Sequence, residues 1–149
     1  MMVDMSTQSE YAASPISHVS DMVDKIEQAG TTAVIAHGKG VVLLTMRGAK
    51  SGKIRKVPLM RVEHGGHYAV VASLGGAPKH PVWYYNLKAE PRIKLQDGDV
   101  TSEFIARELE GDERELWWAR SVEAWPDYAN YQTKTDRILP VFLLEPVDN

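Results

Sequence analysis

The sequence predicts a mainly antiparallel β-fold, either a barrel or a sheet with peripheral helices. Segments 41–46 ("VVLLTM"), 54–62 ("IRKVPLMRV") and 67–73 ("HYAVVAS") have the composition of strands and are joined by short turns. Segment 92–110 has the pattern of a β-hairpin, and segment 137–146 that of a closing strand. No strand-helix-strand crossover recurs along the chain. These six strands, with three or four helices, therefore favour an antiparallel arrangement.

Length and composition favour one globular domain. The chain has 149 residues, 44% of them hydrophobic, which suffices for a single core. We expect the polar residues 1–15 to form a flexible N-terminal segment and residues 16–149 to form the domain. The absence of cysteine excludes disulfides and thiolate chemistry. With no targeting signal and no apolar stretch near the roughly 18 residues of a membrane span, a cytoplasmic location is expected.

The first element is an amphipathic helix. Its apolar residues recur at steps of three and four, and Gly30 follows where a glycine commonly ends a helix. The apolar positions are Ile16, Val19, Met22, Val23, Ile26 and Ala29. A stripe of this kind usually packs on the core of its own domain. Peripheral contact with a membrane is the alternative.

Turn residues and prolines divide the rest of the chain. The stretch "EHGG" at 63–66 predicts a tight turn between the second and third strands. Pro81 and Pro91 bracket a short helix, "VWYYNLKAEP", and Pro126 ends a longer one, "DERELWWARSVEAW". The hairpin is predicted to turn on Asp97-Gly98. Its second arm alternates through Val100, Ser102, Phe104 and Ala106.

Several common catalytic and metal-binding patterns are not met. The stretch "HGKG" at 37–40 lacks two residues of a phosphate-binding loop and is interpreted as the turn into the first strand. His64 and His67 have no third histidine and no cysteine nearby, which favours a hairpin rim over a metal site. No G-x-S-x-G elbow offers a serine nucleophile. The acidic run "EGDERE" is interpreted as a solvated helix face rather than a catalytic pair.

One cluster of charge is left over. The stretch "RGAKSGKIRKVPLMR" holds six basic residues and no acidic one, although the whole chain has a net charge of −3. Lysines on an exposed strand can simply prevent edge aggregation. The turn "GAKSG" is harder to explain in that way, because its glycines and serine are expected to leave backbone N–H groups accessible among Arg47, Lys50 and Arg55. This favours a bound phosphate or carboxylate, whereas the acidic remainder of the chain argues against a nucleic acid.

A second candidate region, "SLGGAPKHPVWYY", follows the third strand. The segment from Ser73 to Gly76 can present bare backbone to a flat ring, and Lys79 adds positive charge. The helix that begins near Pro81 directs its free N–H groups to the same place. The next aromatic residues, 83–85, add ring surface, although one or two of them are expected to pack the helix on the sheet.

In their order along the chain these motifs resemble the deazaflavin-dependent nitroreductase family, split-barrel proteins that use the deazaflavin coenzyme F-420. The resemblance covers about residues 40–146. It is carried by "LLTMRGAKSGKIRKVPL", "VVASLGGAPKHPVWYYNLKAEP", "ARELEGDERELWW" and "WPDYANYQTKTDRILPVFLLEP". It implies a split β-barrel and an oxidoreductase that takes a hydride from the reduced cofactor.

The resemblance also implies which residues bind the cofactor. The phosphate and the oligoglutamate tail would lie at the basic turn, on Arg47, Lys50, Ser51, Arg55, Lys56 and Pro58. The deazaflavin ring would lie on Ser73, Leu74, Gly75, Gly76, Lys79, Pro81, Val82 and Trp83.

A third motif would border the substrate. Trp125, Tyr128 and Tyr131 are three residues apart and are expected on one side of a short helix, with core packing as the other interpretation. Family members that act on nitroimidazoles resemble this motif with a tyrosine in place of Trp125. Tyr128, Tyr131 or Ser73 is expected to hydrogen-bond the oxygen of the electron acceptor and to stabilise negative charge that develops there.

The implied reaction is hydride transfer from reduced F-420 to a small electron acceptor, which is a quinone, an enone or a nitroaromatic. Two alternatives stay open. One is a flavin-mononucleotide oxidoreductase on a similar split barrel, and the other is a non-catalytic protein that binds or carries F-420. Both a monomer and a homodimer are compatible with the sequence.

Overall fold

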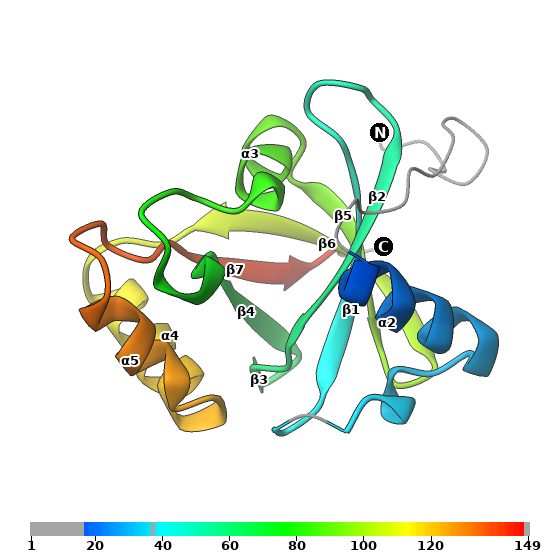
Figure 1. Cartoon of the computed structure of the whole chain (residues 1–149), viewed down its shortest axis with the longest axis horizontal. Coiled ribbons are helices and arrows are strands. Elements are labelled where there is room, and N and C mark those ends of the chain that lie inside the picture. The colour runs from blue at the N-terminus through cyan, green and yellow to red at the C-terminus, as the bar shows by residue number, and fades with distance from the viewer. Residues whose placement is uncertain (1–16, 37, 148–149) are drawn as a thin grey trace.

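Seven antiparallel strands form one curled sheet in the computed structural model, which describes residues 17–36 and 38–147 (Figure 1). The strand order is β2-β1-β5-β6-β7-β4-β3. The strands are β1 (Val41–Arg47), β2 (Ile54–Met60), β3 (Glu63–His64), β4 (His67–Val71), β5 (Arg92–Asp97), β6 (Val100–Glu108) and β7 (Val141–Pro146). The predicted antiparallel class is confirmed. The predicted flexible segment 1–15 lies outside the described residues.

Helices cover both faces of this sheet. Helix α3 packs on one face, and α2, α4 and α5 pack on the other. The α-helices are α2 (Ser17–Ala29), α3 (Val82–Ala89), α4 (Gly111–Ala124) and α5 (Asp127–Thr133). Two short 3-10 turns, η1 (Thr32–Val34) and η2 (Leu74–Gly76), lie in the loops that follow α2 and β4.

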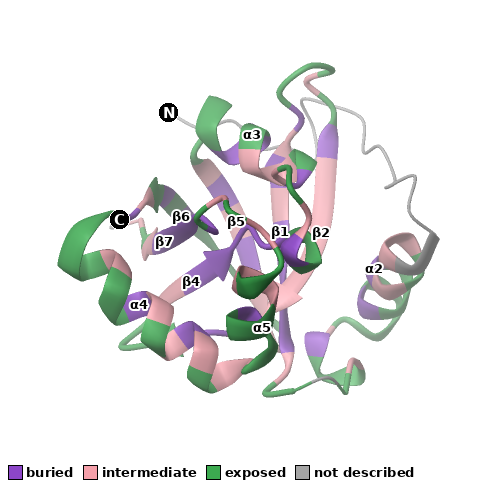
Figure 2. Ribbon diagram, turned by 60° about the vertical axis from the view of Figure 1, so that its left-hand side comes forward, coloured by how far each residue is buried: buried purple, intermediate pink, exposed green. Residues whose placement is uncertain are grey.

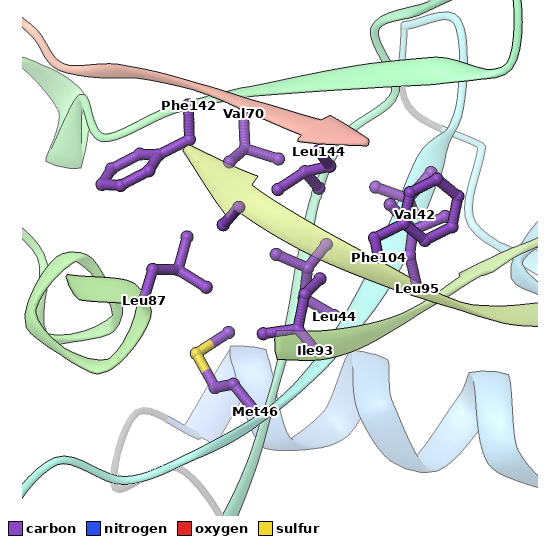
Figure 3. Close-up of a cluster of buried hydrophobic side chains, with 11 residues drawn as sticks. Val42, Leu44, Met46, Val70, Leu87, Ile93, Leu95, Phe104, Phe142 and Leu144 are labelled. Atoms are coloured by element: carbon purple, nitrogen blue, oxygen red, sulfur yellow. The ribbon is translucent and has the colours of Figure 1, made fainter. Parts of the chain in front are cut away.

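Strand β1 is buried on both faces. Successive side chains of a strand point to opposite sides of the sheet, so a strand covered on one side only alternates apolar and polar residues. In β1, Val42, Leu44 and Met46 enter the main core beneath α3 (Figure 3). Val41 and Leu43 pack on the opposite side against α2. Cover on both sides explains why the strand has a continuous apolar sequence.

Strand β7 has the same construction. Phe142 and Leu144 face the main core, whereas Val141 and Leu143 enter a second core beneath α4 and α5. Strand β2, by contrast, lies at the edge of the sheet and is only half-buried after its first residue (Figure 2). One margin of the sheet is therefore left partly uncovered.

The apolar stripe of the first helix packs on the protein's own core. Val23 and Ile26 have no exposed surface and contact the outer side of β1. Gly30 ends α2 with a φ of 74°, and its N–H donates to the carbonyl of Ile26 over 2.8 Å. Ala29 is exposed, and Ile16 lies outside the described residues. In residues 17–36 and 38–147, no helix is long and apolar enough to cross a membrane.

Three strands are shorter than the sequence suggests. They run over 54–60 instead of 54–62, 67–71 instead of 67–73 and 141–146 instead of 137–146. Ahead of the last strand, the side chain of Arg137 binds the loop that follows β4. The predicted "EHGG" turn is confirmed only at Gly65-Gly66, because Glu63–His64 form a seventh, unpredicted strand, β3. His64 and His67 pair across this turn at the rim of the β3-β4 hairpin, and β2 lies at the opposite edge of the sheet.

The turn between β5 and β6 is Gly98-Asp99, and the predicted turn on Asp97-Gly98 is wrong by one residue. Asp97 is still paired with Val100 in the sheet. The predicted alternation along β6 holds at Phe104 and Ala106, which are buried. It fails over 100–103, because β7 ends beside Phe104 and leaves no core next to that part of β6.

Asp97 ties this hairpin to two other strands. It accepts bonds from Nε of Arg61, at 2.9 and 3.0 Å, and from the hydroxyl of Tyr68, at 2.6 Å. Burial, and then the hydrogen bond to Asp97, raise the pKa of Tyr68 to about 12. The Asp97 carboxylate thus joins the end of β2, strand β4 and strand β5.

Replacing Asp97 with alanine should destabilise the fold. The variant loses bonds to a guanidinium and to a tyrosine hydroxyl, so its free energy of unfolding should fall by about 2 kcal/mol. Asp99→Ala, in the exposed turn two residues away, is the matched control and should change stability by less than about 0.5 kcal/mol. Urea unfolding of the three proteins measures both values. Equal losses in the two variants would contradict a role for Asp97 as a tie between strands.

Candidate functional site

A cleft of about 1290 Å³ opens beside the edge strand β2. Its walls come from α2 and η1, from β2, from the loop between β4 and α3, and from α5. The predicted site residues that line it are Arg55, Lys56, Pro58, Ser73, Leu74, Gly75, Lys79, Pro81, Val82, Trp83, Trp125, Tyr128 and Tyr131. Arg47, Lys50, Ser51 and Gly76 do not line it. The fold therefore brings the second and third motifs together with only part of the basic turn.

The charge of the cleft is opposite to that of the protein. Four cationic residues line it: Lys25 of α2, Arg55 and Lys56 of β2, and Lys79 of the β4-α3 loop. Among the described residues that line the cleft there is no Asp or Glu. In a chain of net charge −3, this local excess of positive charge attracts anionic ligands to the cleft.

The β1-β2 turn is more closed than the sequence suggests. The N–H of Gly48 donates to the carbonyl of Lys53 over 2.8 Å, and the N–H of Gly52 donates to the carbonyl of Gly48 over 3.0 Å. The hydroxyl oxygen of Ser51 accepts from the N–H of Lys53. The expectation that this turn leaves its backbone N–H groups accessible is therefore wrong for Gly48 and Gly52, because the turn itself uses these two groups.

Arg47 and Asn86 hold the same turn in place. Nη1 of Arg47 donates to the carbonyl of Gly52 over 3.0 Å. The N–H of Ala49 donates to Oδ1 of Asn86 in α3 over 2.9 Å. Since Asn86 lines the cleft, the turn adjoins the cleft without entering it. The side chain of Lys50 is exposed at the tip of the turn.

Arg137 fixes the loop that follows β4. Its guanidinium donates to the carbonyl oxygens of Ala72 (3.0 Å), Ser73 (2.7 Å) and Ala77 (2.8 Å), and contacts Nδ1 of His80 at 3.1 Å. The planar guanidinium has several donors in a rigid arrangement, which suits such a set of acceptors. Sequence reasoning did not identify Arg137, because a single arginine ahead of an apolar strand carries no local signal.

The backbone of this loop is left-handed at three successive residues. The φ angles are 45° at Leu74, 64° at Gly75 and 86° at Gly76. Leu74 is the one non-glycine residue with positive φ in the described part of the chain, and strain of this kind is concentrated at functional sites. A Cβ at Gly76 would lie 2.5 Å from the carbonyl oxygen of Tyr131, whereas at Gly75 it would meet open space. Gly76 therefore allows the loop to pack closely on α5, while Gly75 leaves room for a ligand.

The three aromatic residues of α3 divide between packing and the cleft. Tyr84 stacks on His80 at a ring distance of 4.1 Å and packs edge-on against Phe142. Trp83 also lies against Phe142, but it lines the cleft as well. Tyr85 is half exposed at the cleft. As expected, part of this set packs the helix on the sheet.

Tyr128 offers a protonated hydroxyl to the cleft. Its side chain is only 5% exposed, and its ring packs edge-on against Tyr131 at 6.2 Å. The hydroxyl makes no hydrogen bond to a described residue. Every fully buried polar side-chain atom in the described chain has a hydrogen-bond partner, so the Tyr128 hydroxyl is not fully buried. The oxygen therefore reaches the open cleft. Burial raises the pKa of Tyr128, so at neutral pH its hydroxyl donates hydrogen bonds.

Trp125 packs on the core and also lines the cleft, but the prediction that it shares a helix with Tyr128 and Tyr131 is wrong. It ends α4 as the residue after the last helical turn and precedes α5, so it does not share a helix with Tyr128 and Tyr131. Its ring packs on the second core and lines the cleft.

The wall of the cleft that comes from the N-terminal part of the chain was not assigned from sequence. It consists of Val19, Met22, Lys25, Val34, Ile35 and Ala36.

Alanine at Gly76 should be more damaging than alanine at Gly75. Either change places a Cβ on left-handed backbone, which costs about 1 kcal/mol. Only at position 76 does the new atom meet backbone, that of Tyr131, so we expect Gly75→Ala to lose about 1 kcal/mol of unfolding free energy and Gly76→Ala at least about 2 kcal/mol. Chemical denaturation measures both losses. Equal values would show that the loop does not pack on α5 as described.

Comparison with known proteins places these features in a family. A model of the F420H(2)-dependent quinone reductase family matches residues 19–146; F420H(2) is the reduced form of coenzyme F-420. The F420H(2)-dependent quinone reductase Rv1261c of Mycobacterium tuberculosis is 35% identical over 106 residues, which are 69% of this chain and 71% of the relative.

Two solved structures are similar as well. An F420-H2 dependent reductase, FDR-A, is 63% identical with a TM-score of 0.67, over 70% of this chain and 93% of that one. A protein described as a domain-swapped dimer is 56% identical with a TM-score of 0.71, over 89% of this chain and all of that one (100%). The expected split-barrel fold and deazaflavin-dependent class are confirmed. The chain belongs to the F420H(2)-dependent quinone reductase family.

Proposed function

We propose that this protein binds reduced coenzyme F-420 in the cleft beside β2 and reduces a quinone there. One observation carries the proposal. The cleft combines four cationic side chains, and no carboxylate among its described residues, with apolar and aromatic walls. The cationic side chains suit an anionic tail, and the apolar and aromatic walls suit a flat ring. A volume of about 1290 Å³ is above the roughly 300–1,000 Å³ of common small-molecule sites, which suits a long cofactor together with an acceptor.

The cationic residues would hold the tail. Arg55 and Lys79 can make charge-assisted bonds to phosphate or carboxylate oxygens within the cleft. Lys56 is held by Glu27 of α2 at 2.9 Å, so it would be shared with that carboxylate. Lys50 and Ser51 are exposed on the adjoining turn and would meet only a part of the tail that leaves the cleft. Arg47 and Pro58 would act mainly by shaping the turn and β2.

The loop after β4 and the start of α3 would receive the ring. Gly75 has open space where a Cβ would be, so a flat ring can approach the backbone from Ser73 to Gly75. Pro81, Val82 and Trp83 form the neighbouring wall. Gly76 would contribute by packing on α5 rather than by contact. When bound, the reduced cofactor supplies the hydride, so the protein's task is placement and electrostatics.

The side chains of α5 would act on the acceptor. The Tyr128 hydroxyl is protonated and faces the cleft, so it can donate to an acceptor oxygen and stabilise the negative charge that develops on it. Tyr131 and Ser73 also line the cleft, and their hydroxyl groups are proposed as further donors. Solvent is the final source of the proton.

The rim of the cleft suits a flat apolar acceptor. Val34, Leu74, Val82 and Tyr85 are large apolar or aromatic residues that are exposed and line the cleft. A quinone can bury its ring against such a rim while its oxygen meets the tyrosines. Enones and nitroaromatics share the flat, electron-poor character and are proposed as further acceptors.

The direct test is a titration of the purified protein with F-420 and, separately, with flavin mononucleotide, followed by assay of quinone reduction with the reduced deazaflavin. We expect binding of F-420 in preference to flavin mononucleotide, and turnover of the quinone. Binding of F-420 without turnover of any acceptor class would indicate a carrier. Preference for flavin mononucleotide would overturn the cofactor assignment.

Arg55→Ala should weaken F-420 binding by about tenfold or more, because it removes a charge-assisted contact inside the cleft. Lys50→Ala should weaken it less, since Lys50 lies outside. Lys39→Ala makes the same change of charge at a residue that does not line the cleft and is the control. The dissociation constant of the wild type should rise with added salt. Unchanged affinity in Arg55→Ala would overturn the placement of the tail.

Tyr128→Phe should keep both the fold and the affinity for F-420, because the ring and its packing remain. It should lower kcat and kcat/KM together, by up to about a hundredfold, if the hydroxyl donates mainly in the transition state. Tyr84→Phe is the matched control, since Tyr84 does not line the cleft. Full activity in Tyr128→Phe would exclude the donor role. Loss of F-420 affinity would place α5 on the cofactor side instead.

A further inference from the structure

The contact between Arg137 and His80 fixes a protonation state. Nη1 of Arg137 lies 3.1 Å from Nδ1 of His80. A guanidinium has only donors and stays charged in proteins, so the ring nitrogen facing it must accept. A neutral imidazole has one donor and one acceptor. With Nδ1 as the acceptor, the proton of His80 is on Nε2.

The surroundings of His80 disfavour a second proton. The ring stacks on Tyr84 and meets Tyr85 edge-on at 6.0 Å, both from α3. Burial, and then the charge of Arg137, lower the pKa of His80, while Glu108 at the end of β6 opposes them. Protonation of Nδ1 would also replace the accepted hydrogen bond by two donors that face each other.

The other nitrogen of the ring, Nε2, is not fully buried. Nε2 of His80 has no hydrogen bond to a described residue, and no fully buried polar side-chain atom in the described chain lacks a partner. Nε2 is therefore accessible. His80 is half-buried and lines the cleft between Lys79 and Pro81, which line it too. Because His80 lines the cleft and its Nε2 is not fully buried, this N–H is the polar group of the ring that can meet a molecule bound in the cleft.

We propose that Arg137 is a positioning residue that holds His80 as the neutral Nε2–H tautomer, and that His80 donates this N–H to an acceptor atom on the ring system of the cofactor. The inference rests on the proposed function. The cofactor is favoured over the quinone because Pro81, the residue after His80, belongs to the wall proposed for the ring, and Lys79, the residue before it, is proposed to hold the tail of the same cofactor. The same guanidinium binds the carbonyls of Ala72, Ser73 and Ala77, so one side chain places both the donor and the backbone beside it.

The tautomer can be observed without any ligand. Long-range proton–nitrogen NMR spectra of the labelled protein distinguish a protonated from an unprotonated ring nitrogen, and His80→Gln identifies the signals of His80 among the five histidines. At pH 7 the wild type should show the Nε2–H form. Arg137→Lys keeps the charge but cannot reach the four acceptors, so a mixture of forms is expected. Arg107→Lys, whose arginine pairs with Glu113 and Glu145, should leave the spectrum of His80 unchanged.

Binding of F-420 tests the donor. His80→Phe keeps an aromatic ring on Tyr84 but has no N–H, and its dissociation constant for F-420 should rise about fivefold to tenfold. His80→Gln carries an amide N–H near the place of Nε2 and should retain most of the affinity. Arg137→Lys should bind as weakly as His80→Phe, and Arg107→Lys as tightly as the wild type. Thermal unfolding of each variant separates weak binding from a lost fold.

The NMR spectra test the role of Arg137, and the binding measurements test the role of His80 as a donor. The Nδ1–H form, or an imidazolium, in the wild type at pH 7 would overturn the role of Arg137. Wild-type affinity in His80→Phe would overturn the donor role, and a higher KM for the quinone with unchanged F-420 affinity would move the donor to the acceptor side. A wild type that binds no F-420 would overturn the proposed function and the donor role with it, while the tautomer would still be judged from the ligand-free spectra.

Discussion

Strands β1 and β7 are apolar on both faces, and this burial requires helices on both sides of the sheet. In β1, Leu43 is buried against α2, and Leu44 is buried in the main core beneath α3. In β7, Leu143 is buried against α4 and α5, and Leu144 is buried in the main core. The edge strand β2 has no second neighbour, and its residues 55–60 are all half-buried (Figure 2). All six of these residues line the cleft. The helices that cover β1 do not fully cover β2 at the edge of the sheet. The cleft lies along this partly uncovered strand.

In the loop after β4, hydrogen bonds offset the strain of the backbone. Three successive left-handed residues, one of them Leu74, are costly for the backbone. The guanidinium of Arg137 offsets this by joining three carbonyls and one imidazole of the same loop. Gly76 adds close packing on α5. Arg137 and Gly76 therefore hold the backbone of this loop in place. Gly75, which has open space where a Cβ would be, lines the cleft.

Local signals were enough for most elements of the fold and for the motifs of the cleft. Gly30 and Pro126 mark helix ends by their own backbone chemistry, and the continuous apolar sequence of β1 indicates a buried strand. What the sequence could not provide depends on partners far along the chain. Arg137 acts on a loop up to 65 residues away, and the closed β1-β2 turn depends in part on Asn86, 37 residues from Ala49. The wall formed by α2 likewise exists only once that helix has packed on β1.

The aromatic residues of the cleft show why spacing alone left two interpretations. The ring of Tyr128 belongs to the second core, and its hydroxyl reaches the cleft. Trp83 similarly packs beside the main core and lines the cleft from the other side. Spacing predicts which face of an element is apolar, but it cannot separate the ring of a tyrosine from its polar end. Because the ring of Tyr128 is buried in the second core, its packing holds the hydroxyl in position before a ligand arrives. A donor fixed in advance needs no reorganisation when charge develops on the acceptor, which is the condition under which a single hydroxyl contributes most to a reaction.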